Sequence, residues 1–243
     1  MLQNCGECYL VRDGQEYFDL APAWDWDLLP GTTLAHGVGK PLRQSFAGAV
    51  TDGVSCAVVM DSRFGTDQTV SLSVQKFWAC NGDVIVCLLS DLTAPEITEP
   101  VRTALDQCRL RGPVTVCDPS GNERVVTGSE TNLSANWVHH SGFAYAPLNG
   151  LKVSIQAGPV SGSWNSINRA GSTNVVTTPV FLAELEHGSR LKGVRGGYVI
   201  LPGSANDAKR IFRNPSWRGV QNDSKIQAVE FNDGTTMAAF HAA

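Results

Sequence analysis

The stretch Lys76-Phe-Trp-Ala-Cys-Asn-Gly-Asp-Val-Ile-Val-Cys-Leu-Leu89 decides the fold, because it contains two β-like runs around a turn signal. Asn81-Gly82-Asp83 is typical of a tight hairpin turn, since such turns need residues that tolerate a positive φ. The run from Val84 to Leu89 is apolar at every position, as expected of a strand covered on both faces. The stretch therefore predicts an antiparallel hairpin in the middle of stacked sheets.

Short β-rich runs recur on both sides of this hairpin. Val70–Val74 alternates with a period of two, as a half-buried antiparallel strand should. Asn232-Asp233-Gly234 supplies a second hairpin turn near the C-terminus. The other runs are Ala57–Asp61, Val114–Cys117, Leu151–Ile155 and Tyr198–Leu201. Strands at this spacing predict an all-β protein built as a large antiparallel sandwich.

Two segments do not fit a series of strands. Glu96–Arg109 is the one segment that could hold a helix, although Pro95, Pro100 and the β-branched residues argue against a long one. The polar segment Gly203–Asn222 is typical of a linker or a long surface connection.

The composition limits what the protein can bind. Of its 243 residues, 42% are hydrophobic and only 17% are charged, and the net charge is −4. A nucleic-acid surface needs a basic patch, so none is expected, and an acidic polymer gains no long-range attraction. The cluster of Arg102, Arg109 and Arg111 is explained at least as well by a solvated strand edge. No apolar run approaches the roughly 20 residues that span a bilayer, so no membrane partner is expected.

The cysteines and the N-terminus give few functional signals. Seven cysteines are an odd number and do not define disulfide pairs. Cys5-Gly-Glu-Cys8 stands alone, and a zinc site would need two further ligands at suitable spacing, so neither a metal nor a cofactor is expected. Met1–Cys5 lacks a charged region followed by an apolar stretch, so no signal peptide is expected in this chain.

The most distinctive stretch is Pro22-Ala-Trp-Asp-Trp-Asp-Leu-Leu-Pro-Gly-Thr-Thr33. On a strand, Trp24 and Trp26 would face the same side, and their rings could form one flat surface. Sugars present apolar C–H faces that stack on such rings. The alternative is that both tryptophans pack as core beneath the Pro30-Gly31 turn, because most tryptophans are largely buried.

Trp137-Val-His-His140, followed by Tyr145, invites an acid–base interpretation, because histidine and tyrosine can relay protons. Adjacent residues on a strand point to opposite faces, so His139 and His140 cannot share a proton or a metal without a bulge. We therefore expect one histidine in the core with a hydrogen bond and the other exposed. No catalytic residue is assigned to this chain.

Taken in order, these stretches resemble the central β super-sandwich domain of family 8 polysaccharide lyases and heparinase II-like lyases. Trp24-Asp-Trp26 with Leu29-Pro-Gly-Thr-Thr33 is similar to the start of that domain, and Thr103-Ala-Leu-Asp-Gln107 is similar to a segment ending in Leu-Asp-Gln. The other matching stretches are Gly48–Gly53, Lys76–Trp78, Asp83–Leu88, Trp137–His140 with Tyr145, Gly162–Asn168, Glu186–Gly188 and Tyr198–Pro202. The similarity runs from about residue 5 to about residue 203.

The resemblance implies a galactose mutarotase-like super-sandwich over residues 1–203, with residues 204–243 forming a connection and a partial C-terminal β segment. Lyases of this kind cleave uronic-acid polysaccharides by β-elimination, with their catalytic Asn, His, Tyr and Arg residues on an N-terminal α/α toroid. That toroid is expected to be absent from this chain, and it is a candidate partner, as a domain or as a subunit.

The family's sheet domain adds a wall of the substrate cleft and usually one glutamate, and Glu7 lies where that glutamate falls. Glu7, Trp24 and Trp26 are therefore the candidate carbohydrate-binding residues, and an acidic polysaccharide is the expected ligand. The resemblance also implies a secreted or periplasmic location.

Three functions remain open at this point. The first is the non-catalytic, glycan-contacting domain of a polysaccharide lyase. The second is a free-standing carbohydrate-binding or scaffold domain with no lyase partner. The third is a small complete enzyme, for instance a sugar epimerase, against which stands the lack of a convincingly spaced pair of catalytic groups.

Overall fold

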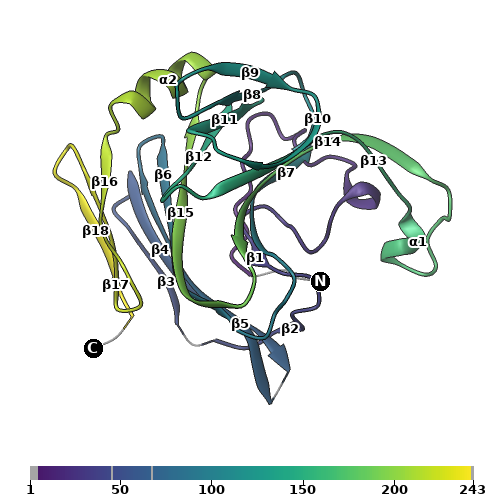
Figure 1. Ribbon diagram of the computed structural model, residues 1–243, viewed down its shortest axis with the longest axis horizontal. Coiled ribbons are helices and arrows are strands. Elements are labelled where there is room, and N and C mark those ends of the chain that lie inside the picture. The colour runs from purple at the N-terminus through teal and green to yellow at the C-terminus, as the bar shows by residue number, and fades with distance from the viewer. Residues whose placement is uncertain (1–4, 45, 67, 242–243) are drawn as a thin grey trace.

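The computed structural model describes residues 5–44, 46–66 and 68–241 (Figure 1). Residues 1–4, part of the segment examined for a signal peptide, lie outside the described residues. The described chain is mainly antiparallel strands arranged in three sheets, which confirms the all-β super-sandwich expected from the sequence. None of the described helices has the length and apolar character needed to cross a membrane.

The largest sheet has ten strands, in the order β2-β4-β5-β6-β15-β12-β11-β8-β9, with β3 also paired to β4. Its strands are β2 (Lys40–Pro41), β3 (Ala47–Thr51), β4 (Ser55–Thr66), β5 (Thr69–Asn81), β6 (Val84–Ala94), β8 (Val114–Cys117), β9 (Glu123–Val126), β11 (Trp137–His140), β12 (Phe143–Pro147) and β15 (Leu191–Pro202). The hairpin predicted at Asn81–Asp83 is present, because β5 ends and β6 begins there.

Two smaller sheets cover the two faces of the ten-stranded sheet. The five-stranded sheet has the order β1-β7-β14-β13-β10, and the three-stranded sheet has the order β16-β17-β18. Their strands are β1 (Thr33–Leu34), β7 (Val101–Arg109), β10 (Gly128–Leu133), β13 (Lys152–Gly162), β14 (Val176–Gly188), β16 (Trp217–Asn222), β17 (Ile226–Phe231) and β18 (Thr236–Phe240). The helical elements are the 3-10 turn η1 (Ala21–Ala23), α1 (Trp164–Ile167) and α2 (Ala205–Arg213).

The layers are held together by two hydrophobic cores. Leu89 of β6 packs in the main core with Leu105 of β7 and Phe181 of β14, from the five-stranded sheet. Its neighbour Leu88 points to the opposite face, because side chains alternate along a strand, and packs in a second core with Phe231 of β17. The strand β6 is thus buried on both faces, as its apolar run predicted.

The backbones of β6 and β15 approach closely in the middle of the ten-stranded sheet. Gly196 and Gly197 of β15 pair with Leu89 and Leu88 of β6. A Cβ atom on Gly197 would lie 2.4 Å from the carbonyl oxygen of Cys87, so a side chain does not fit at this position.

The interpretation of Glu96–Arg109 as a possible helix is wrong. Residues Val101–Arg109 form β7, which pairs with β1 on one side and β14 on the other. Strand β14 pairs with β7 along its length, whereas β1 pairs only with Arg102 and Thr103. On the same edge as β1, the N–H groups of Ala104 and Arg109 donate to the carbonyls of Thr32 and Glu16. Tertiary hydrogen bonds therefore decide the conformation of this segment rather than local propensity.

The interpretation of Gly203–Asn222 as a linker is also wrong. The segment contains α2 and β16, and α2 begins with a capping box. The Ser204 hydroxyl accepts the Asp207 N–H, and the Asp207 carboxylate accepts the Ser204 N–H. This reciprocal pair satisfies two N–H groups at the start of the helix that would otherwise lack partners. Ala208 is the buried residue of this helix and packs in the second core.

Candidate functional site

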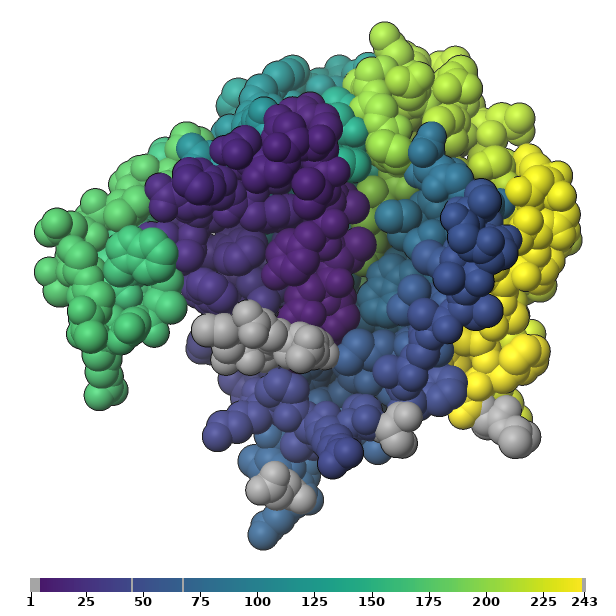
Figure 2. All heavy atoms as spheres, turned by 180° about the vertical axis from the view of Figure 1, so that it is seen from behind, coloured from purple at the N-terminus to yellow at the C-terminus, as the bar shows by residue number. Residues whose placement is uncertain are grey.

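The N-terminal segment lies on the face of the molecule shown in Figure 2, where it is purple and borders the blue strands. It is attached to the Pro30-Gly31 turn, because the Cys8 N–H donates to the Pro30 carbonyl over 2.8 Å. Gly31 in turn donates to the Ala104 carbonyl over 2.8 Å. A Cβ on Gly31, whose φ is +85°, would lie 2.6 Å from the Cys8 nitrogen. The glycine therefore permits the close approach that positions Glu7.

A buried lysine supports the same turn from below. Lys76 of β5 is fully buried, and its Nζ donates to the Gly31 carbonyl over 2.5 Å. The ammonium also lies 5.9 Å from the centre of the Trp78 ring. Burial lowers the pKa of Lys76 to about 8. The role visible here is structural, because the side chain is sealed beneath the turn.

Trp24 and Trp26 do not lie on a strand, so the predicted flat surface is wrong. They follow η1 in a loop, and their rings stand edge to face at 77° with centroids 5.5 Å apart. Both side chains are half-buried rather than core, and Trp24 packs against Leu20 and Ala23. The pair presents two differently oriented ring surfaces instead of one plane.

Gln107 of β7 holds this loop in place. Its Oε1 accepts the Asp25 N–H over 2.7 Å, and its Nε2 donates to the carbonyls of Asp25 and Leu28 over 3.0 and 2.8 Å. The indole N–H of Trp24 donates to the Gln107 carbonyl over 3.1 Å, and that of Trp26 donates to the Ala21 carbonyl over 3.2 Å. With both indole donors occupied, what the tryptophans offer a ligand is ring surface.

Two tyrosines extend the pair into a group of four rings, Tyr9, Tyr17, Trp24 and Trp26, which we call the aromatic cluster. Tyr9 lies 5.1 Å from Tyr17 and 6.3 Å from Trp24, measured between centroids, and it is 45% exposed. Neither tyrosine was predicted as a site residue from the sequence. Neither lies in a periodic pattern, and the contact with Trp24 arises only when the N-terminal segment folds back over the loop.

Glu7 lies two residues before Tyr9, on the wall of a cleft of about 590 Å³ whose described lining contains none of the four rings of the aromatic cluster. Its Oε2 accepts the Cys5 N–H over 3.0 Å, and its charge adds to burial in raising the pKa of Tyr9. The other walls of the cleft are mostly apolar and include Cys8, Val58, Met60, Trp78, Cys80 and Ile85. The structure thus brings Trp24 and Trp26 together with Tyr9, whereas Glu7 lines the neighbouring cleft.

A group of ionisable side chains with perturbed pKa values lies in the main core and bonds to the aromatic cluster through Tyr17. Asp106 of β7 accepts hydrogen bonds from the hydroxyls of Tyr145, over 2.6 Å, and Tyr17, over 3.1 Å. Burial raises the pKa of Asp106 to about 6. Asp106 is 2% exposed and Tyr145 is fully buried, so a polymer in solution does not reach this pair.

The two adjacent histidines point to opposite faces, as predicted. His140 is fully buried, accepts the Arg111 N–H at Nε2 over 3.0 Å and stacks on Phe181. Burial lowers the pKa of His140 to about 4. His139 is half-buried rather than exposed, and its Nε2 lies 2.9 Å from the Gly203 carbonyl oxygen. Both rings are engaged in holding the fold.

The arginine cluster and the cysteines do not form a second site. Arg102 pairs with Glu184 over 3.1 Å, Arg111 pairs with Asp13 over 2.7 Å, and Arg109 donates to the Phe18 carbonyl over 2.9 Å. Within the part of the chain that the structure describes, no group of three or more His, Cys, Asp and Glu residues is arranged to hold a metal ion.

The sequence matches the family model described as polysaccharide lyase family 8, super-sandwich domain, over residues 3–210. It is 29% identical over 228 residues to chondroitinase-AC of Pedobacter heparinus, covering 89% of this chain and 31% of that protein. It is 27% identical over 246 residues to xanthan lyase of Bacillus sp. strain GL1, covering 93% of this chain and 26% of that protein. The chain therefore spans about a third or less of the length of these relatives.

A solved structure supports the same comparison. It belongs to a chondroitinase AC lyase studied in enzyme–oligosaccharide complexes, and it superposes with a TM-score of 0.79 at 26% sequence identity. The superposition covers 94% of this chain and 34% of the lyase chain.

Proposed function

The chain belongs to polysaccharide lyase family 8, whose super-sandwich domain it carries, and from this we propose that it is the non-catalytic, carbohydrate-contacting domain of a polysaccharide lyase. In the whole protein the reaction would be β-elimination of a uronic-acid polysaccharide. The ligand of this domain would be that acidic polysaccharide. Glu7, Trp24 and Trp26 would contact it, together with Tyr9.

The observation that carries the proposal is the aromatic cluster. Ring surfaces bind the C–H faces of sugars, and rigid rings lose little conformational entropy on binding. Gln107 fixes the loop that holds Trp24 and Trp26, so the surface is formed before a ligand arrives. We propose that Glu7 contacts the polysaccharide from the neighbouring cleft, because a carboxylate can accept hydrogen bonds from sugar hydroxyls.

The non-catalytic role is supported by the burial of the acid–base groups. Elimination requires a base that reaches the proton α to a carboxyl group and a partner that neutralises the carboxylate. Asp106, Tyr145 and His140 are sealed in the core, and each is engaged in a hydrogen bond. We propose that the proton-moving residues lie on an α/α toroid, supplied by another domain or subunit.

The alternative is a free-standing carbohydrate-binding or scaffold domain with no lyase partner. Both functions use the same sugar surface, so they differ only in whether a toroid completes a cleft beside it. The discriminating observation is lyase activity of the native gene product, measured as the ultraviolet absorbance of unsaturated uronate. Activity in the native product but not in residues 1–243 favours the lyase domain, whereas inactivity of both favours the free-standing domain.

The binding proposal is tested on the isolated chain by calorimetric titration with chondroitin sulfate, hyaluronan and xanthan oligosaccharides. Trp24→Ala and Trp26→Ala should weaken binding by roughly tenfold each, as loss of a stacked ring does. Trp164→Ala is the matched control, because Trp164 is 43% exposed and lies outside the aromatic cluster. Unchanged affinity in both cluster variants, or an absorbance rise from the isolated chain, contradicts the proposal.

We also propose that residues 1–203 form the super-sandwich and residues 204–243 its C-terminal segment, as one folding unit. Ala208, Val229 and Phe231 of the later segment share the second core with Phe77 and Leu88 of the ten-stranded sheet. A core with members on both sides of residue 203 supports joint unfolding of the two parts.

A further inference from the structure

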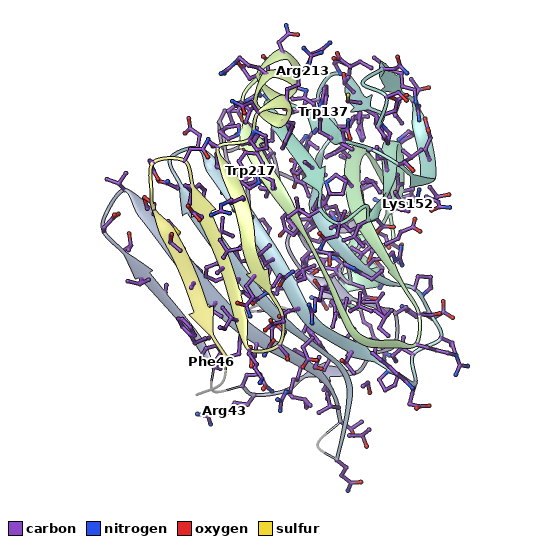
Figure 3. The ribbon with its side chains drawn as sticks, turned by 60° about the vertical axis from the view of Figure 1, so that its left-hand side comes forward. Arg43, Phe46, Trp137, Lys152, Arg213 and Trp217 are labelled. Atoms are coloured by element: carbon purple, nitrogen blue, oxygen red, sulfur yellow. The ribbon has the colours of Figure 1, made fainter. Side chains whose placement is uncertain are left out.

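A second pocket lies on the outer face of the ten-stranded sheet, away from the aromatic cluster. It has a volume of about 460 Å³, which is within the range of small-ligand pockets, about 300–1,000 Å³. Strands β11, β12 and β15 contribute to its lining, and α2 and the start of β16 close it from the side. Figure 3 shows Trp137, Arg213 and Trp217, three of the lining residues, at the same end of the molecule.

Aromatic rings make up much of this pocket. Trp217 is half-buried and stands perpendicular to Phe212, with centroids 5.8 Å apart. Trp137 is 2% exposed, yet its indole N–H makes no hydrogen bond to any described residue. Its indole nitrogen is not among the fully enclosed side-chain atoms that lack a partner, so this donor keeps some accessible surface and is available to an oxygen of a ligand in the pocket.

Both charged side chains that line the pocket are positive. Lys209 and Arg213 of α2 line the pocket, and no carboxylate is among its lining residues. Lys209 is paired with Glu123 over 2.7 Å, whereas Arg213 is exposed and has no ion-pair partner among the described residues. The guanidinium of Arg213 is thus open to an anionic group, which it can bind through two parallel hydrogen bonds.

The rim of the pocket is rigid. Three of its lining residues are prolines, Pro119, Pro147 and Pro215, whose φ angles are fixed by their rings. Asn136, also in the lining, is held by a hydrogen bond from its Nδ2 to the Asp118 carbonyl over 3.0 Å. A ligand therefore meets an ordered site and loses little affinity to reorganisation of the protein.

We infer that this pocket binds one anionic sugar unit of a polysaccharide, as a second site separate from the aromatic cluster. The sugar ring stacks on Trp217, its carboxylate or sulfate pairs with Arg213, and one of its oxygens accepts the Trp137 N–H. The choice of a sugar as ligand rests on the proposed function. The ring of Trp217 and the positive charge of Arg213 indicate a ligand that carries both a ring and a negative charge.

The test uses the six tryptophans of the full chain as reporters. Each indole N–H gives one nitrogen–proton NMR signal, and single Trp→Phe variants assign the signals. Titration with chondroitin sulfate oligosaccharides should shift the signals of Trp137 and Trp217, while those of Trp78 and Trp164 stay in place. Hyaluronan, which carries carboxylates without sulfates, identifies the anionic group: shifts with both polymers assign the carboxylate, and shifts with chondroitin sulfate alone assign the sulfate.

A charge variant separates this site from non-specific attraction. Arg213→Ala should raise the dissociation constant reported by the Trp217 signal roughly tenfold, as loss of a charged hydrogen bond does. Arg210→Ala, one turn earlier on α2 and outside the pocket lining, should change it less than about twofold. Equal effects of the two variants, or equal shifts with a neutral chitin oligosaccharide, overturn the inference.

The failure of this inference is distinguishable from failure of the proposed function. Shifts of Trp24 and Trp26 without shifts of Trp137 and Trp217 leave the proposed function standing and overturn the second site. Shifts confined to Trp137 and Trp217 support the second site and contradict the role of the aromatic cluster. Stationary signals throughout overturn both.

Discussion

The side chain of Gln107 bonds to both backbone groups of Asp25: its Oε1 accepts the Asp25 N–H over 2.7 Å, and its Nε2 donates to the Asp25 carbonyl over 3.0 Å. The Gln107 side-chain amide thus makes the two hydrogen bonds that a residue of a paired strand would make with the Asp25 backbone. A third bond, to the buried Leu28 carbonyl, anchors the loop to β7.

Replacing this side chain should therefore loosen the site without unfolding the sandwich. Gln107→Leu leaves the Leu28 carbonyl without its donor, and we expect a loss of about 2 kcal/mol in the free energy of unfolding. Trp24 and Trp26 should also become more mobile, which tryptophan fluorescence anisotropy measures. Gln15→Leu is the control, because Gln15 is exposed. Equal stability of the two variants would show that the Gln107 bonds do not hold the loop.

Gly31→Ala and Gly14→Ala are matched variants that test the close approach of Gly31 to the Cys8 backbone. Both glycines have a positive φ, +85° and +81°, but a Cβ on Gly14 would contact nothing within 4 Å. Gly14→Ala should cost only the backbone penalty of about 1–2 kcal/mol. Gly31→Ala adds the collision with the Cys8 backbone, and we expect a total of about 2–5 kcal/mol together with weaker glycan binding. Chemical denaturation of both variants measures the difference, and equal costs contradict the steric argument.

The joint unfolding of residues 1–203 and 204–243 is tested by two phenylalanines. Phe231 of β17 is 4% exposed in the second core, whereas Phe240 of β18 is 65% exposed. Phe231→Ala should destabilise the whole protein by about 3–5 kcal/mol in a single thermal transition. Phe240→Ala should change stability by less than about 0.5 kcal/mol. A separate early transition in the Phe231 variant would instead reveal two folding units.

Two histidines with lowered pKa values should contribute a loss of stability on acidification between about pH 6.5 and pH 4. Burial lowers the pKa of His140 and of His187 to about 4 from the ordinary 6.5. Both histidines are neutral in the folded and unfolded chains above pH 6.5, and their full contribution to stability is present there. Below pH 6.5 the unfolded chain binds protons more readily than the folded protein, so this contribution is lost as the pH falls through about 4. Asp106, with its pKa raised to about 6, acts in the opposite direction, because its contribution is lost as the pH rises through 6.

Burial also raises the pKa values of Asp61 and Glu184, so three carboxyl groups oppose the two histidines, and the histidine contribution is measured as a difference between variants. On acidification across this range, the urea midpoint of His187→Gln should gain relative to that of the unsubstituted protein. His36→Gln serves as the control, because the His36 side chain is 82% exposed. A slope that is the same in both variants would contradict the assignment of the pH dependence to buried histidines.

The sheets were predictable where strands are long and their apolar pattern is clear. Val84–Leu89 showed its double burial through an unbroken apolar run, and Asn81–Asp83 showed the turn. The helix α2 was missed although Ser204 and Asp207 carry a capping signal, and although Ala205, Ala208, Ile211 and Phe212 recur at helical spacing and pack in the second core. The polar residues and Pro215 around this short apolar face favoured the interpretation as a linker or surface connection.

The candidate site was predictable in part. Trp24 and Trp26 were singled out, but their alternation with aspartates imitated the period of a strand. Their true conformation depends on Gln107, which lies 82 positions away from Asp25 in the sequence. Tyr9 was missed for the same reason, since its place beside Trp24 depends on a long-range contact. Binding by Glu7, Trp24 and Trp26 stays a prediction until glycan affinities are measured.

The close contact of Gly197 with the Cys87 carbonyl affects how β15 aligns with β6 in the ten-stranded sheet. The part of β6 from Val84 to Leu89 is apolar on both faces, so its pattern of apolar residues alone does not fix its alignment with β15. A slip that brought Tyr198 to the place of Gly197 would put a side chain where no Cβ fits. The pair Gly196-Gly197 thus restricts the two strands to alignments that place a glycine beside the Cys87 carbonyl.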